Sequence, residues 1–256
     1  MDAVHELLRI SVLVPAAEGE SARARLLELA PDGFEEEGDG DTLELFVYGD
    51  ASSDRALRSA FESVATVPVE PGWEERWRAF HRPVRVAGLW VGPPWERPPT
   101  GVRAVTIDPG RAFGTGAHAT TRATIELLDS VPRAPLLDAG CGSGVVAVAA
   151  VRLGFGPVVA VDVDPVAVEV ARENASRNGV EVDVDELDVL GGELPAADVV
   201  VANIELVAVE ALLPRLTSPR AIVSGYLVTD ELRASGWRRE SRVEREGWAA
   251  DSLARV

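Results

Sequence analysis

The chain has 256 residues, of which 46% are hydrophobic and 26% charged, and its mean hydropathy is +0.07. This composition predicts a folded chain of one or two domains and excludes a disordered, collagen-like or coiled-coil protein. The longest apolar runs, such as 145–151 and 155–161, fall well short of the roughly 18 residues that a membrane-spanning helix needs. No such helix and no membrane partner are therefore predicted.

The first residues, MDAVHELLRI, carry acids where a secretory signal would have a basic and then an apolar region. The single cysteine, Cys141, cannot form an intrachain disulfide. Both features predict a cytoplasmic protein. The cysteine and the three histidines, His5, His81 and His118, lack the spacing of metal ligands, so no metal site is predicted.

Every one of the 25 basic residues is an arginine, which excludes chemistry that needs a lysine nucleophile. The net charge is −17, and residues 1–75 alone hold 18 acids and 5 arginines. Such a surface repels phosphate backbones and attracts a basic partner, so direct nucleic-acid binding is not expected. An acidic face that serves only solubility explains the same pattern.

Residues 1–70 predict a small α+β domain. Strands are expected at 9–15, near 33–36, at 42–49 and at 64–70, and helices at 21–30 and 54–64, with Ser21 as the first N-cap. The order β-α-β-β-α-β is that of the ferredoxin-like fold.

Residues 71–105 are rich in tryptophan, proline and arginine. Trp73 and Trp77, four residues apart, would share one face of a short helix. Two interpretations stay open: a linker that packs across both domains, or an N-terminal extension of the second domain's core.

Residues 106–256 predict a doubly wound, Rossmann-like α/β domain. From about residue 136, strands and helices alternate, and the early strands are continuous apolar runs, as in a parallel sheet covered on both faces. The last two segments are joined by little more than Gly247, which indicates a hairpin at the sheet edge.

The first strand of this domain runs into a glycine-rich loop, DAGCGSG, at 138–144. Gly140 and Gly142 allow close approach of a ligand at the start of a helix, which is typical of a nucleotide-type site. Asp162 ends the next strand, 20 residues after Gly142, where an acid can bind the ribose hydroxyls of an adenosine. Alternatively Asp162 caps the following helix, although Asp164, just before Pro165, suits that role better.

The glycine loop followed by VDVD resembles motifs I and II of the class I S-adenosylmethionine-dependent methyltransferases. By this resemblance Asp138 holds the amino group of the ligand, directly or through water, or only orders the loop.

The fourth strand ends in VVVANIEL, with Asn203 at the edge where open α/β sheets bind ligands. An amide oxygen there can orient a nitrogen nucleophile. The segment resembles the Asn-Pro-Pro-aromatic motif of amino-methyltransferases, with Ile204 and Glu205 in place of the prolines. Alternatively, Asn203 is a helix cap.

The segment TIDPGRAFGTGAHATTR, residues 106–122, predicts a binding loop just before a helix. Gly114 and Gly116 would let it move, and Phe113 would pack on the adenine or on the substrate. His118 is either a general base or a hydrogen-bonded loop residue.

These segments together resemble the ribosomal protein L-eleven (L11) methyltransferases, the PrmA family, from about residue 71 to residue 225. The resemblance implies an N-terminal domain that recognises the ribosomal protein, a linker, and a catalytic domain that methylates α- and ε-amino groups with S-adenosylmethionine. It predicts Asn203 as the catalytic residue. The predicted cofactor contacts are Phe113, Thr120, Thr121, Asp138, Gly140, Gly142, Asp162 and Asn203.

Two departures limit the match. Residues 1–70 agree in element order only, and TDELRASGW, after VSGYL, replaces a glutamine-containing helix. The alternatives are the same chemistry on another protein or a small-molecule amine, a nicotinamide dehydrogenase, which the glycine spacing disfavours, or a non-catalytic adenosine-binding module. A monomer is expected.

Overall fold

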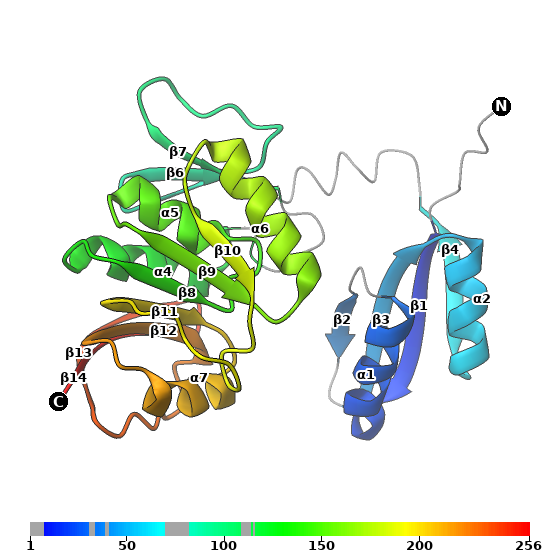
Figure 1. Cartoon of the computed structure of the whole chain (residues 1–256). Coiled ribbons are helices and arrows are strands. Elements are labelled where there is room, and N and C mark those ends of the chain that lie inside the picture. Colours follow the sequence, from blue (N-terminus) through cyan, green and yellow to red (C-terminus); the bar gives the residue numbers. More distant parts are fainter. Residues whose placement is uncertain (1–7, 31–33, 39–40, 70–81, 109–113, 115) are drawn as a thin grey trace. The chain divides into compact units, whose positions relative to one another are not determined.

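The computed structural model describes residues 8–30, 34–38, 41–69, 82–108, 114 and 116–256. Phe113, one of the predicted ligand contacts, lies outside these residues. The chain divides into two compact units, Met1–Ala79 and Phe80–Val256, and each is described by itself. The C-terminal unit holds the larger sheet (Figure 1). Among the described residues, no helix is both long and apolar enough to span a bilayer.

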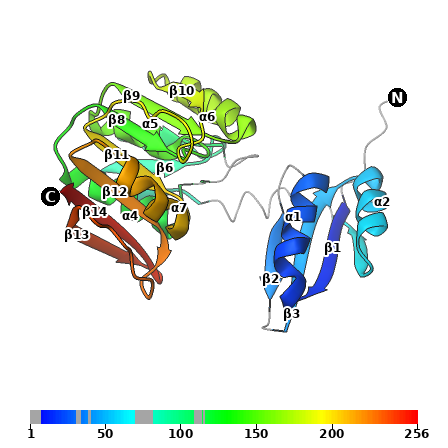
Figure 2. The ribbon, with the colours of Figure 1, turned by 60° about the horizontal axis from the view of Figure 1, so that its bottom comes forward.

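The N-terminal unit has the element order predicted from the sequence, and its four strands form an antiparallel sheet in the order β2-β3-β1-β4 (Figure 1). Figure 2 shows the ribbon turned by 60° about the horizontal axis. Its elements are β1 (Leu8–Pro15), a 3-10 turn (Ala16–Glu18), α1 (Gly19–Leu29), β2 (Glu35–Gly38), β3 (Thr42–Gly49), α2 (Ala51–Ala60) and β4 (Val64–Pro68).

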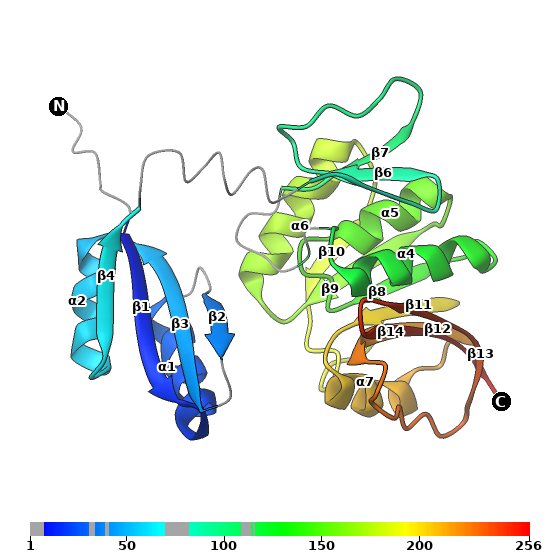
Figure 3. The same cartoon turned by 180° about the vertical axis from the view of Figure 1, so that it is seen from behind.

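One face of this sheet packs against both helices. Alternate residues of β1, namely Ile10 and Val12, are fully buried and share a core with Leu26 of α1 and Leu57 of α2. The period of two places these side chains on one face of the strand. Figure 3 shows the unit from behind.

The first helix begins earlier than the sequence indicated, so the prediction of Ser21 as its N-cap is wrong. The helix continues directly from the 3-10 turn, and Ser21 lies inside it, with its hydroxyl donating to the Glu18 carbonyl at 2.9 Å. The second helix has a clear cap that the sequence analysis missed. The Asp50 carboxylate accepts hydrogen bonds from the backbone N–H groups of Ser52 and Ser53.

The C-terminal unit is built on a seven-stranded sheet in the order β10-β9-β8-β11-β12-β14-β13. Its strands are β8 (Leu136–Ala139), β9 (Val158–Asp162), β10 (Asp183–Glu186), β11 (Val199–Asn203), β12 (Arg220–Leu227), β13 (Trp237–Arg245) and β14 (Trp248–Arg255). The helices are α4 (Ala119–Ser130), α5 (Val145–Leu153), α6 (Pro165–Asn178) and α7 (Leu206–Leu212), with a 3-10 turn at Leu213–Arg215.

The first five strands are parallel, and β14 and β13 are antiparallel to their neighbours. One hydrophobic core lies on the α4, α5 and α6 face of the sheet, and a second lies on the α7 face (Figure 1). Strands such as β8 are buried on both faces, which explains their continuous apolar sequence. The predicted doubly wound α/β domain is confirmed, with a mixed sheet.

Residues 84–106 form a three-stranded sheet of this second unit: β5 (Val84–Val86), β6 (Leu89–Gly92) and β7 (Arg103–Thr106). Strand β7 contacts α5 and α6, and Leu89 and Val105 belong to the core on that face. These strands therefore extend the core of the second unit, which agrees with the interpretation of this region as an N-terminal extension of that core.

The C-terminal hairpin is formed by β13 and β14 around Glu246 and Gly247, as the sequence indicated. The segment 228–236, which leads into it, forms turns instead of a helix. The Asp230 carboxylate accepts from the Leu227 N–H at 2.8 Å, and the Asp230 N–H donates to the Leu227 carbonyl. This turn ends the strand and replaces the first turn of a helix.

Candidate active site

A cavity of about 720 Å³ opens at the carboxyl ends of the parallel strands. In the sheet, β9 lies on one side of β8 and β11 on the other, so the strand order reverses direction at β8. The cavity therefore lies at the topological switch point of the sheet. Its lining includes most of the residues predicted to bind a cofactor: Thr120, Gly140, Gly142, Asp162 and Asn203, together with His118, Asp188, Ile204, Glu205, Gly225 and Trp248.

The glycine loop brings two strand ends into contact. The N–H groups of Gly140 and Cys141 both donate to the Val161 carbonyl, at 2.8 and 3.0 Å. Gly140 has a φ of +78°, and a Cβ there would lie 2.4 Å from Cγ2 of Ile204. Only glycine therefore allows the loop after β8 to lie against the residue that follows Asn203.

Asp162 and Asp164 have separate roles. The Asp162 carboxylate faces the cavity and accepts hydrogen bonds from the N–H of Gly142 at 2.8 Å and of Asp164 at 3.1 Å. The Asp164 carboxylate caps α6 by accepting from the Val166 N–H at 2.9 Å. The alternative that Asp162 caps this helix does not hold.

Asp138 is buried and is not part of the cavity lining. Its Oδ2 accepts from the Ala147 N–H at 3.0 Å, which orders the first turn of α5. Burial raises the pKa of Asp138 to about 7; the hydrogen bond from the Ala147 N–H acts in the opposite direction, and the nearby negative charge of Asp162 adds a smaller upward shift. The position of Asp138 agrees with the alternative that this residue only orders the glycine loop. A direct contact of Asp138 with the amino group of a ligand stays a prediction.

Asn203 ends β11 and lines the cavity opposite Asp162, half-buried. Within the described part of the chain its side-chain amide makes no hydrogen bond, and the N-cap of the next helix is Glu205. The helix-cap alternative for Asn203 is therefore wrong. Its amide remains available to a ligand in the cavity.

The N-terminus of α4 places the two predicted threonines differently. Thr120 lines the cavity, and its Oγ1 lies 2.8 Å from Nδ1 of His118, the N-cap of the helix. Thr121 is fully buried behind the lining, and its hydroxyl finds no partner among the described residues. A ligand contact of Thr121 stays a prediction.

His118 lines the cavity as a hydrogen-bonded residue at a helix start. Partial burial, and next the charge of Arg122, lower its pKa, while Glu246 acts in the opposite direction. A neutral imidazole at pH 7 follows from that direction.

Three features that the sequence analysis missed complete the site. Trp248, the first residue of β14, lines the cavity and contacts the His118 ring edge-on at 5.2 Å between centroids. An ion pair of 2.6 Å between Arg122 and Glu246 ties α4 to the turn of the hairpin. Asp188, after β10, adds a further carboxylate.

Asn174 and Asn178 of α6 hold the segment that leads into the predicted binding loop. Asn178 accepts from the Thr106 N–H at 2.8 Å and donates to its carbonyl at 2.7 Å, while Asn174 accepts from the Asp108 N–H. The amides thus imitate a strand partner for residues 106–108. Further on, the Ser143 hydroxyl donates to the Gly114 carbonyl, which joins this loop to the glycine loop.

The cavity has a marked charge preference. Among the described residues, its lining carries three carboxylates, Asp162, Asp188 and Glu205, and no arginine, in a chain with 25 arginines. Such a lining favours a cationic ligand and gives no counter-charge to a pyrophosphate.

A comparison with known families decides the affiliation of the chain. Residues 47–255 match the family model described as ribosomal protein L11 methyltransferase (PrmA). The chain belongs to this family. A ribosomal protein L11 methyltransferase of Symbiobacterium thermophilum is 43% identical over 200 residues, which cover 71% of this chain and 65% of the relative. One of Pelobacter propionicus is 43% identical over 204 residues, or 74% and 63%.

Among solved structures, a ribosomal protein L11 methylase of Lactobacillus delbrueckii subsp. bulgaricus is similar, with a TM-score of 0.61 and 26% identity. The match covers 68% of this chain and 99% of that one. The matches thus span just under two thirds of the length of the two PrmA relatives. The family resemblance seen in the sequence is confirmed.

Proposed function

We propose that this chain is a methyltransferase that uses S-adenosylmethionine to methylate amino groups of ribosomal protein L11. The observation that carries the proposal is one cavity at the sheet's switch point, with Asp162 and the glycine loop on one side and the free amide of Asn203 on the other. The names of the family and of its relatives supply the substrate.

The residues present fit a sulfonium nucleoside. Asp162 would bind the ribose, and Gly140 and Gly142 would allow the amino-acid tail to approach the backbone. The three carboxylates of the lining suit a ligand whose reacting group is cationic. When bound, this cosubstrate supplies an electrophilic methyl group on sulfur.

The chain's own residues would prepare the amine. A lysine side chain, with an ordinary pKa of about 10.4, is protonated at pH 7 and must lose a proton before it attacks. Desolvation in the cavity lowers that pKa. The Asn203 carbonyl oxygen then accepts a hydrogen bond from the neutral amine and aims its lone pair. Water or Glu205 would accept the proton that the lysine ammonium group loses first, and the neutral nitrogen would then face the electrophilic methyl group.

We infer in addition that residues 1–70 are a ferredoxin-like domain that recognises the protein substrate, and that residues 71–105 are a linker whose strands β5 and β6 pack on the core of the catalytic part. The acidic charge of residues 1–75 suits a lysine-bearing basic partner. The proposal includes a cytoplasmic monomer without direct contact to nucleic acid or membrane. The alternative is the same chemistry on another protein or on a small-molecule amine.

The test is mass spectrometry of purified cognate ribosomal protein L11 after incubation with the enzyme and S-adenosylmethionine. Mass increments of one methyl group, absent with Asp162→Ala, are the expected result. If the mass is unchanged but calorimetry shows that S-adenosylmethionine binds, the assignment of L11 as the substrate is overturned. If S-adenosylmethionine does not bind, its assignment as the cosubstrate is overturned as well.

A further inference from the structure

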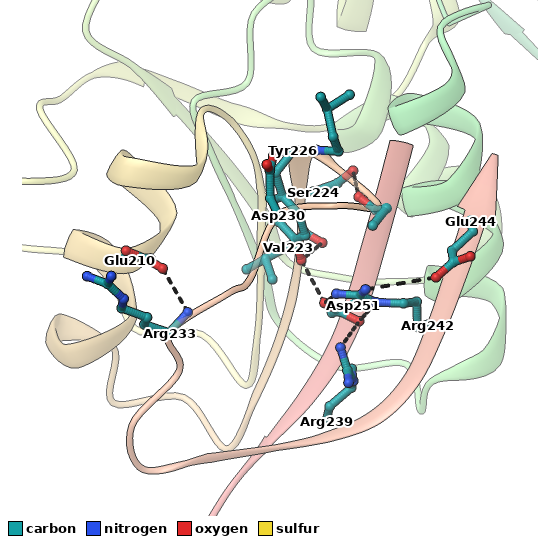
Figure 4. A network of polar contacts seen from close by, with 12 residues as sticks. Glu210, Val223, Ser224, Tyr226, Asp230, Arg233, Arg239, Arg242, Glu244 and Asp251 are labelled. Carbon is teal, nitrogen blue, oxygen red and sulfur yellow. Dashed lines mark hydrogen bonds and ion pairs between the residues drawn. The ribbon is translucent and has the colours of Figure 1, made fainter. Parts of the chain in front are cut away.

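A polar network lies on the α7 face of the sheet (Figure 4). Asp251 of β14 is fully buried, and Arg242 of β13 holds its carboxylate with two parallel hydrogen bonds, Nε to Oδ1 at 2.8 Å and Nη2 to Oδ2 at 2.7 Å. Arg239 adds an ion pair at 3.6 Å. The Tyr226 hydroxyl donates to Oδ2 of the same carboxylate at 2.9 Å.

The network is attached to an irregular part of β12. Pairing with β14 shifts between Ser224 and Tyr226, so that Gly225 bulges out of the ladder with a φ of +106°. The Ser224 hydroxyl donates to the Ala249 carbonyl at 2.8 Å on one side of the bulge. Tyr226, whose ring is buried, fixes the other side through Asp251.

This bulge is in direct contact with the segment that carries Asn203. In the parallel register Asn203 lies opposite Ser224, and the Ile204 N–H donates to the Ser224 carbonyl at 3.1 Å. A Cβ on Gly225 would lie 2.0 Å from the Ile204 carbonyl oxygen and 2.7 Å from its carbon. Gly225 is therefore in contact with the Ile204–Glu205 peptide group, one residue beyond Asn203, and a shift of the bulge must move that peptide group.

We propose that Tyr226 and Asp251 are positioning residues for the reaction: through the bulge at Gly225 they set the orientation of the Asn203 amide. This inference rests on the proposed function of Asn203. Neither side chain lines the cavity, so neither is a catalytic residue. Apolar side chains would fill this buried space equally well. The two hydrogen bonds from Arg242, by contrast, fix the orientation of the Asp251 carboxylate and therefore the direction of the Tyr226 hydroxyl.

The main variants are Tyr226→Phe and the triple variant Tyr226→Phe/Asp251→Leu/Arg242→Met. The triple variant keeps apolar volume while removing the directional contacts of Tyr226 and Asp251, and replacing a buried ion pair in this way is often neutral for stability. We expect both variants to lower kcat by roughly 3- to 10-fold, because small misplacements of a catalytic group reduce rates in this range or more. The Kd for S-adenosylmethionine should stay within about twofold, since Asp162 and the glycine loop are held by β8 and β9.

The matched control is Glu240→Gln on β13, which loses the charge that pairs with Arg220 of β12 and Arg238 of β13 but has no contact with the bulge among the described residues. It should lower the melting temperature without changing kcat. A normal kcat in a folded triple variant would overturn the inference, as would equal loss of kcat in the control.

A second readout does not need turnover. The ¹H–¹⁵N signals of the Asn203 side-chain amide, assigned by loss in Asn203→Ala, should shift in Tyr226→Phe and stay in place in Glu240→Gln. Signals that do not move in Tyr226→Phe would overturn the inference even if the wild-type chain methylates nothing. Shifted signals with an inactive wild-type chain would instead contradict the proposed function alone.

Discussion

The Gly142 N–H donates a 2.8 Å hydrogen bond to the Asp162 carboxylate, so the glycine loop after β8 and the end of β9 are joined across 20 residues of sequence. One carboxylate oxygen is thereby committed to the loop, and the other accepts from the Asp164 N–H at 3.1 Å. Each carboxylate oxygen has a further lone pair, which can accept a hydrogen bond from a hydroxyl group of a ligand in the cavity.

This arrangement predicts how Asp162→Asn changes ligand binding. The variant keeps an acceptor for the Gly142 N–H but loses the charge and the second acceptor, which faces the Asp164 N–H. A hydrogen bond to a charged group contributes about 1.5–3 kcal/mol, so the Kd for S-adenosylmethionine should rise roughly 10- to 100-fold. Calorimetry measures it. Asp164→Asn is the matched control, because Asp164 caps α6 outside the lining, and there the Kd should stay near the wild-type value. Equal weakening by both variants would contradict the assignment.

Asn203→Ala should separate binding from catalysis. Removing the amide takes away the acceptor for the amine, and kcat should fall at least tenfold, in line with the loss of one positioned polar group. The Kd for S-adenosylmethionine should change by less than about threefold, since Asp162 and the glycine loop remain. Steady-state kinetics with the protein substrate measure the first value and calorimetry the second. Near-normal turnover would remove Asn203 from the catalytic role.

The pKa of Asp138 makes stability depend on pH with a definite sign. Its folded pKa of about 7 lies above the ordinary value near 4, so between these pH values the native state binds more protons than the unfolded state. Stability is therefore lost as pH rises from 4 to 7. Asp138→Asn keeps an acceptor for Ala147 without the charge. Relative to wild type, its free energy of unfolding should increase by on the order of 4 kcal/mol across this range.

Urea unfolding of both proteins at pH 4, 5.5 and 7 measures the change in this difference. A difference that stays constant with pH would show that Asp138 is ionised in the folded state throughout, contrary to the expectation from its burial.

Two glycines with similar backbone angles allow a sharp test of the bulge. Gly225 and Gly236 both have positive φ, at +106° and +80°, but only at Gly225 would a Cβ meet backbone, 2.0 Å from the Ile204 carbonyl oxygen. Gly236→Ala should cost about 1 kcal/mol of stability from strain alone. Gly225→Ala should cost clearly more and also abolish turnover, because the Ile204 peptide must move. Thermal unfolding and activity measure the two effects, and equal losses in both variants would exclude a special role for the contact.

The candidate site was predictable where its residues belong to a recognisable local sequence pattern. Gly140, Gly142 and Asp162 follow a known spacing, and Asn203 ends an apolar strand, so the rule that parallel strands present their carboxyl ends at one edge brings them together. Thr120 and Thr121, by contrast, are neighbours with similar local signals. The rotation of α4 decided that Thr120 lines the cavity and Thr121 lies in the core.

The three-stranded sheet of residues 84–106 was not predicted, whereas the order of elements in residues 1–70, the doubly wound domain, the glycine loop with its acid, and the family were predictable from the sequence. These depend on short-range patterns: hydrophobic period, caps and turns, and residue spacing. The tertiary structure alone decided which distant residues complete the site. Trp248 reaches His118 across 130 residues, and Asp251 supports Asn203 through Tyr226 and Gly225. Such contacts depend on strand order and on one bulge in β12, and no local pattern encodes them, because the long-range packing that creates them involves the whole sheet.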